Sequence, residues 1–415
     1  MPNLLIITDI LQATPRIPGL AKYLHRLGWK VFIITPPLPC SKCKQLKDIK
    51  VIKVNYFNII NWFKSPTDPG KGTFSHQEPS KFILYGFKKL GEFYAYPDWQ
   101  RFWKRPAIKV IEELLLKEKI DLIYSSSSPV TSHTIAKYIS QKYPIPWVSE
   151  MRDLWSDNYR YLYGKIRRFF DKRLEHNTLK YSDAIITVIE PWSDDLRNKY
   201  CNKESYTITN GFDPGKVNYK PDKLLNKFTI TYTGNIYKGN QEPSLLLRAI
   251  KELLDDKFIS GIQVRFYGPY YNWLQDEIEK YNLQSIVKQY GPVTRKESLK
   301  HQRESHLLLL LQWESKIISH RILKEFHFGK VFEYLAARRP ILVTGGEVLH
   351  RIVHESNSGV CCQDLPSLKK SILKYYVLHE GNETIKFKGD LQKINKHSYQ
   401  ELAKELDKIF MGIIG

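Results

Sequence analysis

Short apolar runs alternate with amphipathic helix patterns along most of this 415-residue chain. The first repeat places a strand at residues 4–8, a helix at 19–27 that ends at Gly28, and a second strand at 30–35. Strand, helix and strand in this order are typical of a doubly wound domain, in which parallel strands form a sheet and helices cover its faces. The pattern therefore predicts the α/β class.

The chain is longer than one hydrophobic core usually supports. Single cores stop growing at about 250–300 residues, so we expect two domains of roughly 200 residues each. In the first half the alternation continues with helices at 107–117, 132–143 and 192–199 and strands at 122–125, 147–150, 184–188 and 205–209. Residues 213–227 carry Pro214, Gly215 and Pro221 without periodicity, which predicts a linker.

A second alternating half follows the predicted linker. Its strands are expected at 229–233, 263–267, 306–312 and 341–343, and its helices at 243–254, 273–281, 298–303 and 331–339. Because this half repeats the organisation of the first, we expect two Rossmann-like doubly wound domains that face each other across a cleft. Ligands are then expected at the carboxyl ends of the strands.

Two glutamates eight positions apart frame the start of the helix predicted at 331–339. Glu325 precedes the helix and Glu333 lies near its start, with Gly329 and Lys330 between them. A helix N-terminus carries unpaired N–H groups and a partial positive charge, so it can hold a diphosphate, while a nearby carboxylate can accept hydrogen bonds from sugar hydroxyls. Gly329 permits a tight turn and close approach of a ligand, and Lys330 adds a cation. The pattern favours a nucleotide-sugar site.

Four further segments accompany the two glutamates. They are Pro-Trp-Val-Ser-Glu-Met-Arg-Asp-Leu-Trp at 146–155, Thr-Asn-Gly-Phe-Asp at 209–213, Tyr-Thr-Gly-Asn-Ile-Tyr-Lys-Gly at 232–239 and Tyr-Gly-Pro-Val at 290–293. Together with the E-x7-E spacing and the run Tyr-Leu-Ala-Ala-Arg-Arg-Pro-Ile-Leu that follows it, they resemble the landmarks of retaining glycosyltransferases of family 4, in the family's order. One such segment would be a weak signal, but the ordered set is hard to obtain by chance.

The resemblance implies the GT-B fold and a nucleotide-sugar-dependent hexosyltransferase. The expected reaction moves a hexose-type sugar, with retention, to a glycan or lipid-linked acceptor in cell-surface polysaccharide assembly. Residues 1–212 would form the acceptor-side domain and 228–395 the donor domain, and a helix at 396–415 would cross back to the first domain. Family chemistry has the acceptor attack on the face that the diphosphate leaves, so it needs no side-chain nucleophile.

The resemblance also assigns roles at the donor site. Glu333 is similar to the acid that binds the nucleotide ribose, and Glu325 to the acid that faces the transferred sugar. Lys330 and Gly329 are expected at the diphosphate, with Phe328 beside them. Gly234 and Asn235 are expected to contact the donor as well. A solvated helix glutamate is the alternative interpretation of Glu333, and a solvent-facing lysine that of Lys330.

The loop after Gly234 departs from the family pattern. Many relatives carry an arginine or a basic pair there to neutralise the leaving diphosphate, whereas this chain has Asn235, Asn240 and Gln241. Lys238 is the one cation in the loop, so we assign the neutralising role to it. Its alternative role is that of a surface lysine in a turn, and a chain that binds nucleotide-sugar without efficient catalysis then becomes an alternative function.

The sequence predicts no metal and no cofactor. It contains no Asp-x-Asp, which agrees with metal-independent transfer. Cys40 and Cys43 form one C-x-x-C without a second pair of ligands, so loop cysteines are the better interpretation. Five cysteines in all, an odd number, favour a reducing compartment, which indicates the cytoplasm. No apolar run approaches the roughly 18 residues of a membrane span.

Polar residues follow the strands predicted at 122–125 and 147–150, at the edge where the acceptor is expected. His133 either orients the acceptor or is a packed histidine at a helix start, and the second interpretation is favoured. Asp153 either assists the acceptor hydroxyl or pairs with Arg152 to brace the turn after the strand. Both interpretations of Asp153 stay open.

The net charge of +21 is the largest deviation in composition. Basic and aromatic residues mix at 82–105 and at 159–180, which fits either an anionic membrane surface or a solvated basic face over an ordinary core. The first interpretation would place the protein at the inner face of the membrane. A basic nucleic-acid-binding protein is the alternative from another class, but the chain lacks any recognised nucleic-acid module, so no nucleic-acid partner is expected.

Overall fold

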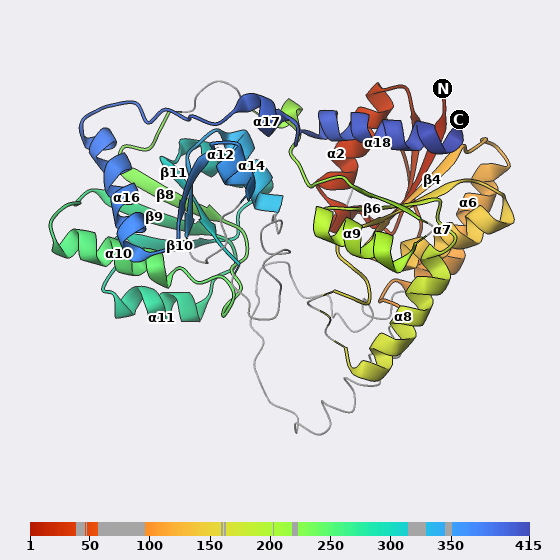
Figure 1. The fold of residues 1–415 in the computed structure, drawn as a ribbon, viewed down its shortest axis with the longest axis horizontal. Coiled ribbons are helices and arrows are strands. Elements are labelled where there is room, and N and C mark those ends of the chain that lie inside the picture. The colour runs from red at the N-terminus through yellow and green to blue at the C-terminus, as the bar shows by residue number, and fades with distance from the viewer. Residues whose placement is uncertain are drawn as a thin grey trace. The chain divides into compact units, whose positions relative to one another are not determined.

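The computed structural model describes residues 1–38, 46, 48–56, 96–158, 161, 163–201, 203–217, 223–313, 329–344 and 351–415 (Figure 1). The chain forms two compact units. Unit 1 comprises Met1–Thr209 and Ala403–Gly415, and unit 2 comprises Asn210–Leu402. The division after residue 209 precedes the linker that the sequence predicts at 213–227, and the last residues of the chain belong to unit 1.

The described part of unit 1 contains a seven-stranded sheet in the order β3-β2-β1-β4-β5-β6-β7. The strands are β1 (Asn3–Ile7), β2 (Lys30–Thr35), β3 (Lys50–Lys53), β4 (Leu122–Ser127), β5 (Trp147–Met151), β6 (Ala184–Thr187) and β7 (Glu204–Thr207). All neighbouring strands are parallel. β1, β4, β5 and β6 are buried almost throughout, which is why they are near-continuous apolar or small-residue runs without alternation.

Helices surround this sheet in the described residues. They are α1 (Ile10–Ala13), α2 (Arg16–Arg26), α6 (Lys104–Leu115), α7 (Thr131–Lys142), α8 (Lys165–Leu179), α9 (Glu190–Lys199) and the end of α18 (Tyr399–Ile414), with a 3-10 turn at Arg101–Trp103. The end of α18 packs on unit 1, where Trp29 Nε1 donates to Asp407 at 2.7 Å. The Phe410 ring meets the rings of Trp29 and Tyr124 edge to face, at 5.7 Å and 5.2 Å.

The described part of unit 2 contains a six-stranded parallel sheet in the order β10-β9-β8-β11-β12-β13. Its strands are β8 (Phe228–Thr233), β9 (Ile262–Tyr267), β10 (Val287–Gly291), β11 (Leu307–Leu311), β12 (Ile341–Thr344) and β13 (Gly359–Cys362). Its helices are α10 (Ser244–Asp255), α11 (Asn272–Lys280), α12 (Arg295–Glu304), α14 (Gly329–Ala337), α15 (Arg351–Glu355), α16 (Leu365–Glu380), α17 (Leu391–Asn395) and the start of α18, with a 3-10 turn at Pro214–Lys216.

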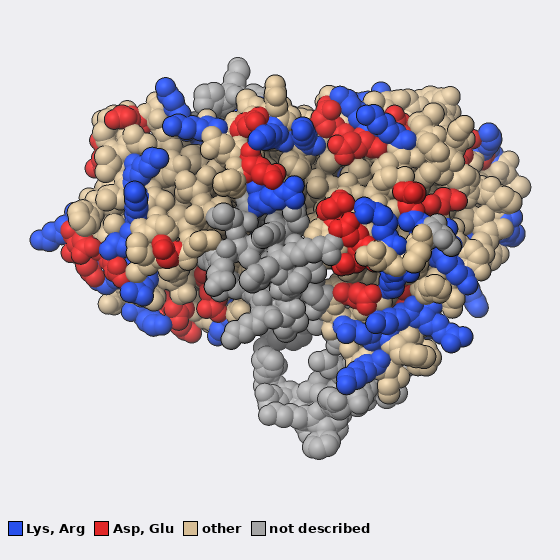
Figure 2. All heavy atoms as spheres, viewed as in Figure 1, with Lys and Arg blue, Asp and Glu red and all other residues tan. Residues whose placement is uncertain are grey.

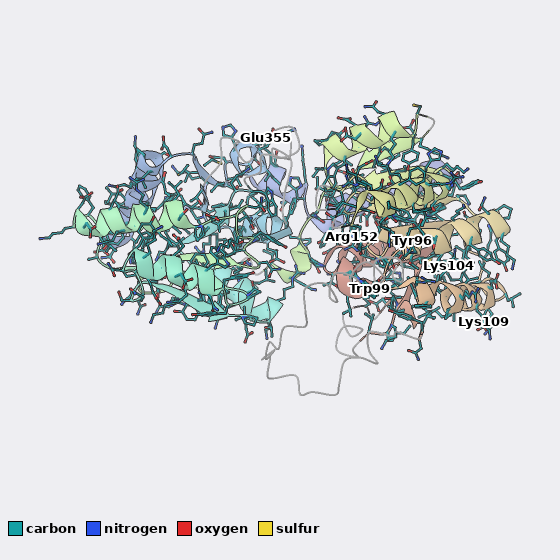
Figure 3. The ribbon with its side chains drawn as sticks, turned by 90° about the horizontal axis from the view of Figure 1, so that it is seen from below. Tyr96, Trp99, Lys104, Lys109, Arg152 and Glu355 are labelled. Atoms are coloured by element: carbon teal, nitrogen blue, oxygen red, sulfur yellow. The ribbon has the colours of Figure 1, made fainter. Side chains whose placement is uncertain are left out.

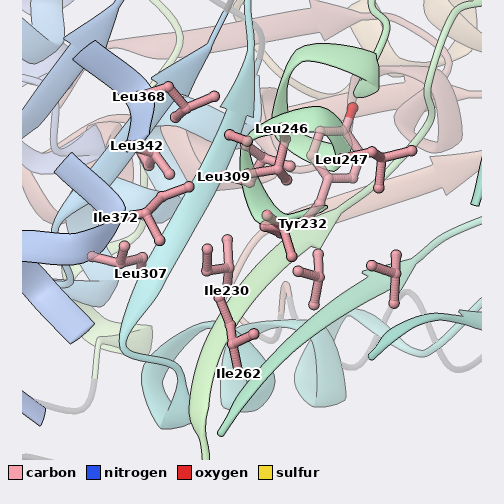
Figure 4. Close-up of a cluster of buried hydrophobic side chains, with 14 of the residues drawn as sticks. Ile230, Tyr232, Leu246, Leu247, Ile262, Leu307, Leu309, Leu342, Leu368 and Ile372 are labelled. Atoms are coloured by element: carbon pink, nitrogen blue, oxygen red, sulfur yellow. The ribbon is translucent and has the colours of Figure 1, made fainter. Parts of the chain in front are cut away.

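The core of unit 2 lies between the sheet and the helices on its faces (Figure 4). All five leucines of β11 are buried, because parallel neighbours pair with it on both sides and helices cover both faces. On one face, Leu307 and Leu309 pack in one cluster with side chains of α10 and α16, among them Leu246 and Ile372. Helix α10 buries Leu246, Leu247, Ile250 and Leu253, a helical spacing that gives it one apolar face.

The strand order of each sheet reverses once near its middle, between β1 and β4 and between β8 and β11. In doubly wound sheets, ligands bind outside the carboxyl ends of the strands at such a switch point. A functional site is therefore expected at the carboxyl ends of β8 and β11 in unit 2 and of β1 and β4 in unit 1. Across the described residues, no helix combines the length and the apolar character that a membrane span requires.

Candidate functional site

A glycine turn follows β8 at the switch point of unit 2. Gly234 has φ of +106°, a conformation that residues with a Cβ rarely adopt. Its N–H donates to Tyr267 O at 2.7 Å, which ties the turn to the end of β9. A Cβ on Gly268 would lie 2.3 Å from Gly234 O, so the two loops pack backbone to backbone. Backbone contacts thus fix Gly234 at the end of β8, and the side chains of Tyr232 and Lys330 add hydrogen bonds to Asn235 O of the same turn.

Lys330, the second residue of α14, reaches over this turn. Its Nζ donates to Tyr232 Oη and, at 3.2 Å, to Asn235 O, and it lies 4.0 Å from the centre of the Tyr232 ring. A Cβ on Gly234 would lie 3.5 Å from Lys330 Nζ. The structure thus brings together Gly234, Asn235 and Lys330, which the sequence analysis assigned to the donor.

The environment of Lys330 lowers its pKa to about 7. Burial is the main cause, because it disfavours the charged ammonium, and the Glu333 carboxylate one turn later acts in the opposite direction. A lysine that is only partly protonated near neutral pH gains charge when an anion binds beside it. Lys330 is therefore suited to respond to a phosphate.

Helix α14 is fixed to the end of β8 by a side-chain contact. Tyr334 Oη accepts a hydrogen bond from Thr233 N at 2.9 Å, and Gln302 Nε2 of α12 donates to Thr233 Oγ1 at 2.9 Å. Both contacts are buried. They hold the first turns of α14, and with them Lys330 and Glu333, in place relative to the Gly234 turn.

Glu333 forms an ion pair with Arg295 at the start of α12, with 2.8 Å between Nη2 and Oε1. Gln302 Nε2 lies 3.4 Å from the other carboxylate oxygen. Glu333 and Arg295 line a hollow in unit 2, together with Phe212, Asp213, Lys216, Val217, Leu299, Arg303, Ala336 and Ala337. Arg295 was not among the residues predicted from the sequence.

The remaining predicted donor residues have different outcomes. Gly329 begins α14 without a positive φ, and nothing lies within 4 Å of the place where a Cβ would be, so its role at the diphosphate stays a prediction. Lys238 is exposed in a turn before Gly239, and its Nζ lies 5.9 Å from the centre of the Trp273 ring. Its role stays a prediction. Glu325 and Phe328 lie outside the described residues, as do Cys40 and Cys43.

His133, in the first turn of α7, is fully buried in unit 1. Its Nδ1 lies 2.7 Å from Ser125 Oγ, which also accepts a hydrogen bond from Trp147 Nε1 at 2.7 Å. Burial lowers the pKa of His133 to about 3, so the ring is neutral. These contacts agree with the interpretation of a packed histidine at a helix start, and the acceptor role stays a prediction.

Arg152 follows β5 and joins two loops at the strand ends of unit 1 (Figure 3). Its guanidinium donates to the carbonyls of Ser127 at 2.8 Å and Ser128 at 2.7 Å, and also to Gln12 O. Burial lowers its pKa, while the carboxylates of Glu150 and Asp153 act in the opposite direction. Asp153 itself is exposed beside it, so the structure is compatible with both of its predicted roles.

A buried ion pair that sequence reasoning missed lies beneath Arg152. Arg16 Nη2 and Glu150 Oε1 are 2.7 Å apart, and their side chains are 3% and 0% exposed. Arg16 also donates to Ile208 O at 2.8 Å and to Thr209 O, the last residue of unit 1 before unit 2 begins. The pair connects α2, β5 and the segment after β7.

The comparison with known families identifies the first part of the chain. The family model described as Glycosyltransferase Family 4 matches residues 19–216. This part of the chain is similar to the proteins of that family. The protein is therefore a glycosyltransferase, and the resemblance inferred from the sequence is confirmed. No curated protein matches the chain.

Solved structures similar to this glycosyltransferase have the same fold over its whole length. Sucrose-phosphate synthase from Thermosynechococcus elongatus is 13% identical with a TM-score of 0.62, and 99% of each chain is covered. HepE from Anabaena, solved in complex with UDP and glucose, is 12% identical with a TM-score of 0.63, covering 99% of this chain and 100% of HepE. TarM is 10% identical with a TM-score of 0.64, and 99% of each chain is covered. The two parallel sheets are those of the GT-B fold, which confirms the predicted fold class.

The glycosyltransferase shows no metal cluster in the part of the chain that is described: no three His, Cys, Asp or Glu side chains there are placed to share an ion. The groups gathered at the unit 2 switch point are the N–H groups of the first turn of α14, the Lys330 ammonium and the Glu333 carboxylate. Such a set can bind a diphosphate through the cation and the N–H groups, and hydroxyl groups through the carboxylate.

Proposed function

We propose that this glycosyltransferase transfers a hexose-type sugar from a nucleotide-sugar to a glycan or lipid-linked acceptor, with retention, in the assembly of a cell-surface polysaccharide. The observation that carries the proposal is the convergence of the Gly234 turn, Lys330 and Glu333 at the carboxyl ends of the unit 2 strands. A nucleotide-sugar needs both an anion site and a hydroxyl acceptor, and this constellation provides both.

The donor binds to unit 2 in this proposal. The diphosphate lies against the Gly234 turn and the first turn of α14, where Lys330 leaves Asn235 O and the Tyr232 hydroxyl to pair with it. Glu333 accepts hydrogen bonds from the ribose hydroxyls. HepE has been solved with UDP-glucose, so uridine nucleotides are the first donors to test.

The transfer step uses charge stabilisation rather than a covalent enzyme intermediate. The bond from the anomeric carbon to the diphosphate breaks, the bond to the acceptor oxygen forms on the same face, and the acceptor proton passes to the leaving phosphate. Lys238 stabilises the charge that develops on that phosphate, and Glu325 faces the transferred sugar. No metal or other cofactor is required.

The acceptor binds to unit 1 in this proposal, at the carboxyl ends of β4 and β5. Asp153 is exposed there and assists the acceptor hydroxyl, while Arg152 fixes the two loops beside it. We further propose a cytoplasmic location, where activated sugars and lipid-linked acceptors meet at the inner face of the membrane.

A thermal-shift panel of UDP, GDP, ADP and CMP sugars tests the donor assignment. A ligand at 100 times its dissociation constant stabilises the protein by about 2.7 kcal/mol, so the correct donor raises the melting temperature clearly. The stabilising donor is then incubated with saccharide and lipid-linked acceptors, and NMR of the product reads the anomeric configuration.

Three outcomes would contradict parts of the proposal. Stabilisation by oligonucleotides alone, with an affinity that falls steeply with salt, would indicate the nucleic-acid-binding alternative. Binding of a nucleotide-sugar without turnover on any acceptor or on water would indicate a protein that has lost catalysis. An inverted product would refute retention and leave the donor site intact.

A further inference from the structure

The exposed face of α8 carries three large apolar side chains. Ile166 is 69% exposed, Phe169 62% and Phe170 46%. Together with Arg173 they occupy positions i, i+3, i+4 and i+7, which lie on one side of a helix. Three such side chains on one face form a clustered apolar surface rather than isolated exposed residues.

The opposite face of α8 fixes the helix to unit 1 through buried polar contacts. Arg167 and Asp171 are 1% and 2% exposed and form an ion pair of 3.0 Å. Arg167 also donates to Pro97 O at 2.8 Å and lies over the Tyr96 ring, 4.5 Å from its centre. The buried acid Glu175 accepts from Ser156 N at 3.0 Å. These contacts determine which face of the helix points to solvent.

Both acids of α8, Asp171 and Glu175, belong to the buried face. The charged residues exposed along the helix are therefore all basic, namely Lys165, Arg168, Lys172 and Arg173. Figure 2 shows Lys and Arg side chains gathered where Figure 1 draws α8, with uncharged side chains among them. The result is an amphipathic surface in which exposed aromatic and aliphatic groups lie beside a row of cations, with Lys165, Arg168 and Lys172 along one side of them.

We propose that this face of α8 docks the protein on an anionic lipid bilayer. The cations match the negative surface potential of the bilayer, and Ile166, Phe169 and Phe170 enter the boundary between headgroups and acyl chains. Nucleic acid is the weaker match. Ile166 offers no stacking surface to a base, and a phosphate backbone offers no apolar phase for Phe169 and Phe170. The proposal goes beyond the reaction and does not rest on it.

Vesicle co-sedimentation of the full chain tests the proposal. We expect binding to vesicles of phosphatidylglycerol and phosphatidylcholine in roughly equal amounts, and none to pure phosphatidylcholine. Raising sodium chloride from about 0.1 M to about 0.5 M should weaken the binding. Absence of binding to the anionic vesicles would refute the proposal.

Two triple variants separate the contributions of charge and apolar surface. Lys165→Gln/Arg168→Gln/Arg173→Gln should weaken vesicle binding by about a hundredfold, since each cation near the surface contributes about a fivefold factor. Ile166→Ser/Phe169→Ser/Phe170→Ser keeps every charge and should weaken binding by at least about tenfold. The matched controls on unit 2, Lys280→Gln/Lys288→Gln/Lys300→Gln and Phe258→Ser/Val377→Ser, should bind as the wild type does.

A single conservative variant keeps the test decisive if a triple variant unfolds. Phe169→Trp should gain fluorescence quenching by brominated lipids relative to the wild type, because residue 169 enters the acyl region. Unchanged quenching would refute insertion. The proposal would also be refuted if an oligonucleotide bound as tightly as the vesicles and the triple serine variant still bound both. That result would show that α8 is a general surface for polyanions.

Discussion

Arg295 of α12 and Glu333 of α14 form an ion pair with 2.8 Å between Nη2 and Oε1, in which the side chains are 34% and 19% exposed. The pair holds in place the carboxylate that we assign to the donor ribose. A carboxylate has about four lone-pair positions, so contacts with Arg295 and Gln302 leave room for two hydroxyl donors. Arg295 thus acts on the donor through Glu333.

Replacement of Arg295 tests this relationship. Arg295→Ala should weaken binding of the nucleoside diphosphate by about tenfold, because the carboxylate loses a charge-assisted hydrogen bond that orients it. The double variant with Glu333→Gln should bind no more weakly than Glu333→Gln alone, as measured by calorimetry. Lys300→Ala, on the same helix, is the control and should change nothing. If the losses in binding free energy of the two single variants added up in the double variant, Arg295 would contact the ligand independently of Glu333.

The pH dependence of donor affinity tests the role of Lys330. Its pKa is about 7 in the free protein, and a bound diphosphate raises that pKa, so binding takes up a proton whenever the free lysine is neutral. Affinity for a nucleotide-sugar, whose diphosphate stays ionised, should be greatest below pH 7. Above pH 7 it should fall by up to about tenfold per pH unit. Lys330→Arg should bind equally across this range, since the guanidinium stays charged.

A flat pH profile for the wild-type protein would remove Lys330 from the diphosphate site. The same profile measured with Glu333→Gln serves as a control. That variant lacks the carboxylate that raises the pKa of Lys330, so the decline in affinity should begin at lower pH.

Lys238→Ala tests the assignment of the leaving-group cation. An interaction that strengthens as charge develops on the phosphate lowers the barrier without tightening donor binding, so turnover should fall by roughly a hundredfold or more while donor affinity changes much less. Single-turnover kinetics at saturating donor measures the step directly. Lys288→Ala, an exposed lysine on the same unit, should have no effect. An unchanged rate for Lys238→Ala would assign the neutralisation to another residue.

The buried pair of Arg16 and Glu150 should contribute strongly to the stability of unit 1. Glu150→Gln leaves the Arg16 charge without its partner, so we expect the free energy of unfolding to fall by about 3–5 kcal/mol in denaturant titrations. Glu112→Gln, in the exposed ion pair with Lys142, should leave the unfolding midpoint nearly unchanged. A loss for Glu150→Gln as small as that of the control would refute the stabilising role.

The same pair predicts a dependence on acid. Burial alone would raise the pKa of Glu150, but the charge and hydrogen bonds of Arg16 outweigh it, so the pKa of Glu150 lies below its usual value of 4.5. A carboxyl group whose pKa is lower in the folded than in the unfolded protein stabilises the fold at any pH above its unfolded pKa. This stabilisation is lost as the pH falls through the folded pKa. The difference in the free energy of unfolding between the wild type and Glu150→Gln should therefore have its full size above about pH 4.5 and should shrink below that pH.

Most of the fold follows from the sequence because buried parallel strands are near-continuous apolar runs. The strand predicted at 30–35 is β2, and the run of five leucines is β11. Helix α8 was not predicted, because its apolar side chains face solvent and its buried face carries Arg167, Asp171 and Glu175. Apolar periodicity, on which helix prediction rests, points to the wrong side of this helix.

The candidate site was predicted only where its signals are local. Gly234, Asn235 and Lys330 lie in short motifs, and the structure brings them together. Arg295 was missed because the helix was expected to begin at residue 298, whereas Thr294 caps a helix that begins three residues earlier, at Arg295. Arg16 contacts Glu150 across 134 positions of sequence, and no local pattern indicates such a partner.

Titration of the nucleoside diphosphate that matches the stabilising donor is the most direct test of the central claim that unit 2 binds the donor at these residues. Calorimetry should show that Glu333→Gln and Lys330→Met each weaken binding by at least about tenfold. Glu325→Gln should retain nucleotide affinity and lose transfer, because it is assigned to the sugar. Equal affinity of the wild type and the Glu333 and Lys330 variants would contradict the account.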